Sequence, residues 1–236
     1  MAFDLSDGAV GRSVGSPPSV ASPDTVAAEP TDSAASASPN GSATGDPLSN
    51  TSPDDKSRRL IPEAGTGTFR VATGRNGPTD AARTYQVELE RGLPFDLAEI
   101  TRTVDSTLAD PRGWSAEPRN LLARVDGGAD LRVVVASPET ADRLCAPLGT
   151  EGRLSCRNGA NVVLNAWRWE NGGPGYLKNI ADYRRYVINH EIGHALGYGH
   201  VGCPRQGALA PVMLQQTLGL QGCRPNAWPA RVDLAH

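Results

Sequence analysis

Three histidines and a glutamate stand close together late in the chain, in the stretch HEIGHALGYGH at residues 190–200. His190 and His194 are four residues apart, so on a helix their imidazoles lie on one face, about one turn from each other. Glu191 follows His190 directly, where its carboxylate can address a water molecule on the same ion. This spacing predicts that His190 and His194 share one divalent metal ion.

A third ligand requires the chain to reverse direction after the helix. Gly197 comes three residues after His194, and glycine adopts the left-handed conformation that ends many helices. The chain can then return His200 to the ion. Three neutral nitrogen ligands that leave a fourth position for water are typical of a catalytic zinc site. We therefore expect one catalytic Zn²⁺ ion bound by His190, His194 and His200.

The chemistry of such a site would be hydrolysis. Zinc polarises a carbonyl group and lowers the pKa of its bound water to about 7. Glu191 would act as the general base that accepts the proton of this water and delivers it to the leaving amine. We expect a zinc-dependent endopeptidase with a protein or peptide substrate. Two alternatives stay open: a catalytically inactive, zinc-stabilised module that binds the cell envelope, and a zinc hydrolase that acts on peptidoglycan peptides.

Four cysteines follow residue 144, namely Cys145, Cys156, Cys203 and Cys223. An even number without a C-x-x-C pair predicts two disulfides and an oxidising compartment, although three pairings are possible. We favour the local pairs Cys145–Cys156 and Cys203–Cys223, the second of which would close a loop around Met213. A rival interpretation makes Cys203 a fourth zinc ligand, which would give a closed, structural site.

The disulfides predict a secreted or cell-surface protein. The N-terminal residues MAFDLSDGAV lack the basic and apolar regions of an export signal, so we expect that signal to be absent from this chain. No run of about 18 apolar residues predicts a transmembrane helix. The net charge of −3 provides no basic field, so nucleic acid is not an expected partner. A monomer is expected.

Composition divides the chain in two. Residues 1–66 are rich in Ser, Pro and Ala and predict a disordered tail or stalk, whereas residues 67–236 carry the periodic apolar patterns of a folded domain. We expect strands near 69–71, 85–89, 121–125, 131–136 and 161–166, and helices at 97–108, 138–144 and 177–196. Asp96 offers an N-cap for the first helix, 167–175 reads as a turn-rich connection, and the chain after Gly197 should be irregular. This order predicts an α+β domain.

The pattern H-E-x-x-H-x-x-G-x-x-H, followed by Pro211-Val212-Met213, resembles the metzincin metallopeptidases. At closer range, DPRGW (110–114), YRRYVINHEIGHALGYGH (183–200) and APVMLQQT (210–217) resemble an actinobacterial family of secreted zincin-like domains without an assigned substrate. The resemblance implies a twisted mixed sheet with an active-site helix in an upper part, residues 67–197. A small irregular lower part, residues 198–236, would contain a Met-turn in which Met213 has a structural role beneath the zinc.

Two features qualify the resemblance. After Met213 the chain continues Leu-Gln-Gln, so it lacks the tyrosine that serves as an additional zinc ligand in some metzincins. Pro225 and Pro229 make a long C-terminal helix hard to fit. By resemblance, the strand at 161–166 could pair with an extended peptide substrate; the alternative is a plain inner strand.

Overall fold

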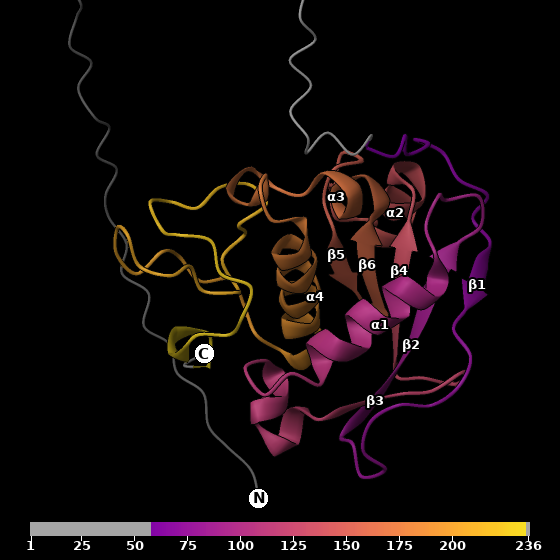
Figure 1. Cartoon of the computed structure of the whole chain (residues 1–236), viewed down its shortest axis with the longest axis horizontal. Coiled ribbons are helices and arrows are strands. Elements are labelled where there is room, and N and C mark those ends of the chain that lie inside the picture. Colours follow the sequence, from indigo (N-terminus) through magenta and orange to yellow (C-terminus); the bar gives the residue numbers. More distant parts are fainter. Residues whose placement is uncertain (1–57, 235–236) are drawn as a thin grey trace, which may run out of the picture. The chain divides into compact units, whose positions relative to one another are not determined.

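The structure, a computed structural model, describes residues 58–234. They form a mixed α+β domain around an open sheet with parallel and antiparallel strands, which confirms the predicted fold class (Figure 1). The disordered tail predicted for residues 1–66 lies mostly outside the described residues. Its last part, residues 58–66, packs on the domain: Ile61 is buried and the backbone N–H of Arg59 donates to Glu170. The folded domain therefore begins before residue 67.

The sheet has the order β1-β2-β4-β6-β5, and its three central strands are parallel. The two outer strands, β1 and β5, run antiparallel to their neighbours. The short strand β3 pairs parallel with β2 beside this path. The strand bounds are β1 Phe69–Val71, β2 Arg83–Glu90, β3 Leu122–Arg124, β4 Leu131–Ala136, β5 Cys156–Asn158 and β6 Asn161–Asn165.

Helices cover both faces of the sheet (Figure 1). α1 (Leu97–Leu108) and α4 (Ile180–Leu196) pack through the main core cluster on one face, and α2 (Pro138–Cys145) packs on the other. The alternation within β4 explains this arrangement, because Val133 and Val135 face α1 and α4 whereas Val134 faces α2. A central parallel strand that is buried on both faces typically has a continuous apolar sequence.

Helix caps account for two boundaries. The Asp96 side chain accepts a hydrogen bond from the N–H of Glu99 at 2.8 Å and begins α1, as predicted. The Asn165 side chain accepts from the N–H of Trp167 at 3.0 Å, so a short helix, α3 (Ala166–Asn171), starts where β6 ends. The predicted turn-rich connection at 167–175 was therefore wrong in its first half, because an asparagine cap was overlooked.

The remaining elements are short 3₁₀ turns: η1 Trp114–Ala116, η2 Pro118–Asn120, η3 Pro174–Tyr176 and η4 Arg231–Leu234. Side chains hold the C-terminal region where regular hydrogen bonding is lacking. The buried Gln216 accepts from the Tyr176 hydroxyl at 2.7 Å and donates to the carbonyl of Pro211 at 3.0 Å. Asn226 donates to the carbonyl of Ala210 at 2.8 Å. These bonds satisfy buried backbone groups that a sheet would otherwise pair.

Two disulfides join the predicted local pairs. Cys145–Cys156 ties α2 to β5, and Cys203–Cys223 closes the loop that contains Met213. The rival interpretation of Cys203 as a zinc ligand was wrong, because its sulfur is bonded to Cys223. Across residues 58–234, no helix combines the length and apolar character that crossing a membrane requires.

Candidate metal centre

Three imidazoles meet at the C-terminal end of α4. The possible ligand atoms of His190, His194 and His200 all lie within 4.8 Å of one another, and the Nε2 atoms of His194 and His200 are 3.0 Å apart. Gly197 ends the helix with φ 102° in the left-handed region, and its N–H bonds back to the carbonyl of His194. The chain then reverses and brings His200 to the two helix histidines.

Backbone carbonyls orient the two helix histidines. His190 Nδ1 is 2.8 Å from the carbonyl oxygen of Val212, and His194 Nδ1 is 2.9 Å from that of Tyr198. A carbonyl oxygen can only accept, so each Nδ1 carries the hydrogen and each Nε2 presents a free lone pair. Histidines that bind metals are commonly fixed in this way. The donor set therefore fits a metal ion.

The protonation states suit metal binding. Burial lowers the pKa of His190 to about 3, and burial also lowers the pKa values of His194 and His200. All three imidazoles are consequently neutral at pH 7, which is the form that coordinates a cation.

Glu191 is almost fully buried beside this cluster and lines the same cleft. Burial raises the pKa of its carboxyl group to about 8. A cation held by the neighbouring imidazoles would favour the ionised carboxylate, since an opposite charge stabilises the charged form. A buried carboxyl group that faces a cleft and titrates close to neutral pH is suited to proton transfer.

Met213 lies fully buried beneath α4. A Cβ atom at Gly193 would overlap its sulfur and lie 2.7 Å from Cζ2 of Trp114, so only glycine fits at this position of the helix. The carbonyl of Pro211 accepts from the N–H of Leu214 at 3.1 Å, which closes a turn around Met213. This turn also supplies the Val212 carbonyl that orients His190.

Asp233 fixes the same turn from the C-terminal side. Its buried carboxylate accepts from the N–H groups of Val212 and Met213 at 3.0 Å and 2.9 Å. Burial raises the pKa of Asp233 although these N–H groups oppose the change. Sequence reasoning missed this residue, because an aspartate twenty positions downstream gives no local signal of such a contact.

Tyr198, to which the sequence assigned no role, contacts both the core and one histidine of the centre. Its ring stacks on Trp114 with centroids 4.5 Å apart, and its carbonyl orients His194. Trp114 in turn donates from its indole N–H to the carbonyl of Asn189 at 2.8 Å. The tryptophan is therefore an anchor within the core beneath the helix.

A cleft of about 430 Å³ opens over the three histidines and Glu191. Its wall comes from the segment between α2 and β5, and the C-terminal region contributes one exposed residue. Sequence reasoning did not identify these residues, because they are distant in the chain from the histidine motif. The cleft is also lined by Leu148, Thr150, Leu154, Arg157 and Gln215.

The wall segment is held rigidly. The Cys145–Cys156 disulfide closes it at both ends. The carboxylate of Asp142 accepts from the N–H of Gly152 at 2.8 Å and from the Thr150 hydroxyl, and the Asn165 side chain donates to the carbonyl of Gly152 at 3.1 Å. The shape of the cleft is thus largely set before a ligand binds.

The strand beside the cleft is β5. β6 pairs with β4 on one side and β5 on the other, so the expectation that residues 161–166 pair with a substrate was wrong and the plain inner strand is correct. β5 escaped prediction because its three residues, Cys-Arg-Asn, carry no apolar alternation.

A family model described as "Protein of unknown function (DUF3152)" matches residues 57–229. This range includes the three histidines, Glu191 and Met213, but ends before Asp233. No curated protein and no solved structure matches the chain.

Proposed function

The chain belongs to the DUF3152 family of proteins of unknown function, and from its site we propose that it is a zinc-dependent endopeptidase. The observation that carries the proposal is the convergence of His190, His194 and His200 beside the buried carboxyl group of Glu191 in an open cleft. A purely structural metal site would not need a carboxyl group buried next to the ligands.

The donor set favours zinc. Three neutral imidazoles with no thiolate among them suit a borderline cation, and a three-histidine set with an open position is common in zinc hydrolases. When bound, zinc would supply a Lewis acid that activates water and polarises a carbonyl group. His190 and His194 are preorganised for this ion, since backbone carbonyls fix their rings.

Two side chains would carry out the proton transfer and the polar contacts. Glu191 accepts a proton from the attacking water, the water oxygen bonds to the scissile carbonyl carbon, and the C–N bond then breaks. Glu191 passes the same proton to the leaving amine nitrogen. Gln215, exposed at the edge of the cleft, offers amide N–H groups to the carbonyl oxygen as negative charge develops on it.

The turn around Met213 supports the resemblance to metzincins. A buried methionine in a turn beneath the histidine helix is what that resemblance implies. The region after α4, which contains little regular structure, would then form the lower half of the cleft.

Two disulfides support a location in an oxidising compartment. We therefore place the proposed peptidase outside the cytoplasm, secreted or at the cell surface. Extended peptides are the substrate class that fits an open cleft beside an edge strand.

Metal analysis combined with a peptide-library digest tests the proposal. The full chain should bind one zinc ion, and Glu191→Gln should keep that ion while kcat falls by roughly 10²–10⁴-fold, the usual contribution of a general base. Glu139→Gln changes an exposed glutamate of α2 outside the cleft and serves as the matched control.

Two results would contradict the proposal. Undiminished hydrolysis by the zinc-loaded Glu191→Gln variant would remove the assigned base. A zinc-loaded wild type that cleaves neither library peptides nor peptidoglycan peptides would favour the binding module instead.

A further inference from the structure

We infer that Arg157 gives the cleft a preference for substrates that carry a carboxylate close to the scissile bond. This inference rests on the proposed function and specifies its substrate class. The carboxylate could belong to an acidic side chain or to the C-terminus of a peptide, and the two sources share one chemistry.

Arg157 is the middle residue of β5 and lines the cleft together with the three histidines and Glu191. Its side chain is exposed, whereas the preceding Cys156 is buried and bonded to Cys145. The disulfide thus fixes the strand immediately beside this arginine. A guanidinium held at the margin of a cleft is suited to bidentate recognition of a carboxylate.

The guanidinium of Arg157 makes no hydrogen bond or ion pair with any residue in the described part of the chain. Arg132 in β4 and Arg153 in the segment before β5 are, by contrast, paired with Glu88 and Glu63 at 2.6 Å and 2.8 Å. The nearby Asp130 is bound to the N–H and hydroxyl of Thr84 at 2.7 Å and 2.8 Å. An incoming carboxylate would therefore meet an unpaired cation.

The cleft contains few acidic groups that would compete with an incoming anion for Arg157. Apart from the neutral histidines, Arg157 and Glu191 are its ionisable lining residues, and Glu191 lies buried beside the candidate metal ligands. With a divalent ion bound, the net charge of the cleft is positive. Leu148 and Leu154 line the same wall and lower the local dielectric constant, which strengthens attraction between a guanidinium and a carboxylate.

The strand register gives this preference a defined position. Ala160 accepts from the N–H of Arg132 in β4, so Val162, two residues later, also directs its backbone groups to β4. Arg157, its partner in the register, then directs its N–H and C=O to the free edge. A peptide that pairs there places one side chain directly opposite Arg157 on the same face.

Matched peptides test the inference with the zinc-loaded full chain. One set has blocked ends and carries Glu, Gln or Lys at each position around the cleaved bond; a second set has no acidic side chain and a free or amidated C-terminus. We expect kcat/KM for one Glu position, or for the free C-terminus, to exceed that of the neutral peptide roughly 5-fold, the factor equivalent to about 1 kcal/mol.

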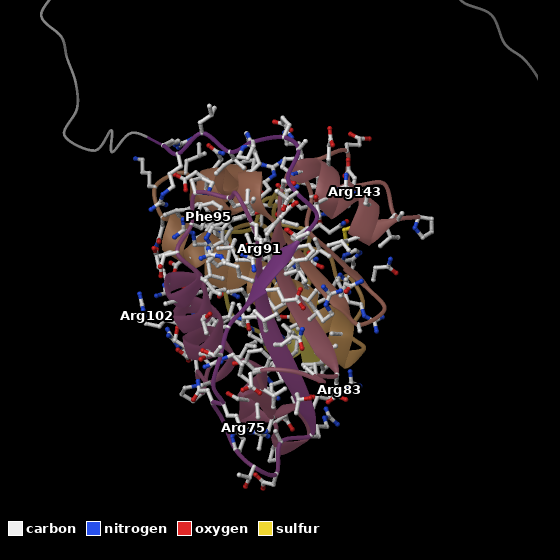
Figure 2. The ribbon with its side chains drawn as sticks, turned by 90° about the vertical axis from the view of Figure 1, so that its right-hand side faces the viewer. Arg75, Arg83, Arg91, Phe95, Arg102 and Arg143 are labelled. Carbon is white, nitrogen blue, oxygen red and sulfur yellow. A yellow bond between two sulfur atoms is a disulfide. The ribbon has the colours of Figure 1, made fainter. Side chains whose placement is uncertain are left out.

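Variants assign the preference to the guanidinium. Arg157→Gln should abolish the ratio between Glu and Gln peptides, Arg157→Glu should invert it in favour of Lys, and Arg157→Lys should restore part of it. Arg102→Gln is the matched control, because Arg102 is exposed on α1 (Figure 2) and is not among the residues that line the cleft. Equal ratios in wild type and Arg157→Gln would overturn the inference.

A binding measurement separates this inference from the proposed function. Zinc-loaded Glu191→Gln cannot use the assigned base, so the affinity of labelled Glu, Gln and Lys peptides reports recognition alone. Tighter binding of the Glu peptide that disappears in Glu191→Gln/Arg157→Gln supports the inference even if no peptide is cleaved. Cleavage by wild type without any carboxylate preference would leave the proposed function standing and refute the role of Arg157.

Discussion

Backbone carbonyls, not acidic side chains, orient the helix histidines of the candidate centre. The carbonyl of Val212 belongs to the turn that contains Met213, and the carbonyl of Tyr198 follows the end of α4. Burial disfavours the charged form of all three groups, but only Glu191 would be charged at neutral pH if it were exposed to water. In the metal-free protein, the buried Glu191 should therefore lower the free energy of unfolding, and this loss can be measured.

Glu191→Gln should stabilise the metal-free protein at pH 8. Burial raises the pKa of Glu191 from 4.5 to about 8, so between these values the unfolded chain loses a proton that the folded chain keeps, and stability falls as pH rises. Glutamine removes this penalty, on the order of 4 kcal/mol at pH 8 and little at pH 4. Urea unfolding in chelator checks this, with Glu139→Gln as control; equal stability at both pH values would contradict it.

Gly193→Ala should destabilise the domain despite the better helix propensity of alanine. That propensity is worth about 1 kcal/mol, but the new Cβ would overlap the Met213 sulfur and press on Trp114, and overpacking costs roughly 1–3 kcal/mol. We expect a net loss of about 1 kcal/mol in urea unfolding. Gly127→Ala, where no atom lies within 4 Å, is the control. A more stable Gly193→Ala would show that the contact is loose.

Local spacing was enough to predict the part of the site within HEIGHALGYGH. Helical periodicity places His190 beside His194, and glycine chemistry explains the reversal before His200. Arg157, Gln215 and Asp233 could not be found in this way, because strand order and loop packing bring them to the site. At this scale the sequence predicts the candidate ligands and the candidate base, whereas the residues proposed to face a substrate require the tertiary structure.

At the scale of elements, each disulfide serves a different side of the cleft. Cys145–Cys156 fixes the wall between α2 and β5, and Cys203–Cys223 fixes the C-terminal loop that follows His200.

Long elements such as β2, β4, α1 and α4 were predictable because their apolar periodicity extends over many residues. β5 and α3 were not, since three residues carry no period and α3 depends on one asparagine cap.

Removing each disulfide should separate these roles. Replacing either pair by serine should lower the free energy of unfolding by about 3 kcal/mol. The Cys203→Ser/Cys223→Ser variant should also bind zinc roughly tenfold more weakly, as expected when the support of a ligand is lost, since Cys203 lies three residues after His200. Cys145→Ser/Cys156→Ser should raise KM and keep zinc affinity close to wild type. Chelator competition measures the affinities; equal weakening in both variants would argue against separate roles.

At the scale of the molecule, the folded domain extends further towards the N-terminus than composition suggested. The carbonyl of Glu63 accepts from the N–H of Glu139 at 3.0 Å, and at the predicted boundary the N–H of Gly67 donates to the buried carboxylate of Glu90 at 2.7 Å. Ile61 is buried in the main core. Ser, Pro and Gly enrichment hid these contacts, because a single isoleucine within a polar stretch carries no periodic signal.

A chain that begins at residue 68 should therefore be less stable than one that begins at residue 57. The deletion removes Ile61 from the core and one donor from Glu90; burial of an isoleucine is worth about 1.5–3 kcal/mol, and a lost partner of a buried group about 1–3 kcal/mol. We expect a combined loss of about 3 kcal/mol in urea unfolding. Equal stability of the two chains would show that residues 58–67 contribute nothing to the stability of the folded domain.

The central claim is that three imidazoles share one zinc ion that keeps a coordination position open beside Glu191. Zinc K-edge X-ray absorption on the full chain with one equivalent of zinc tests it most directly. We predict only nitrogen and oxygen neighbours at about 2.0–2.1 Å, with outer-shell scattering from three imidazoles that decreases to two in His200→Ala. A sulfur neighbour at about 2.3 Å, or a spectrum unchanged by His200→Ala, would contradict the account.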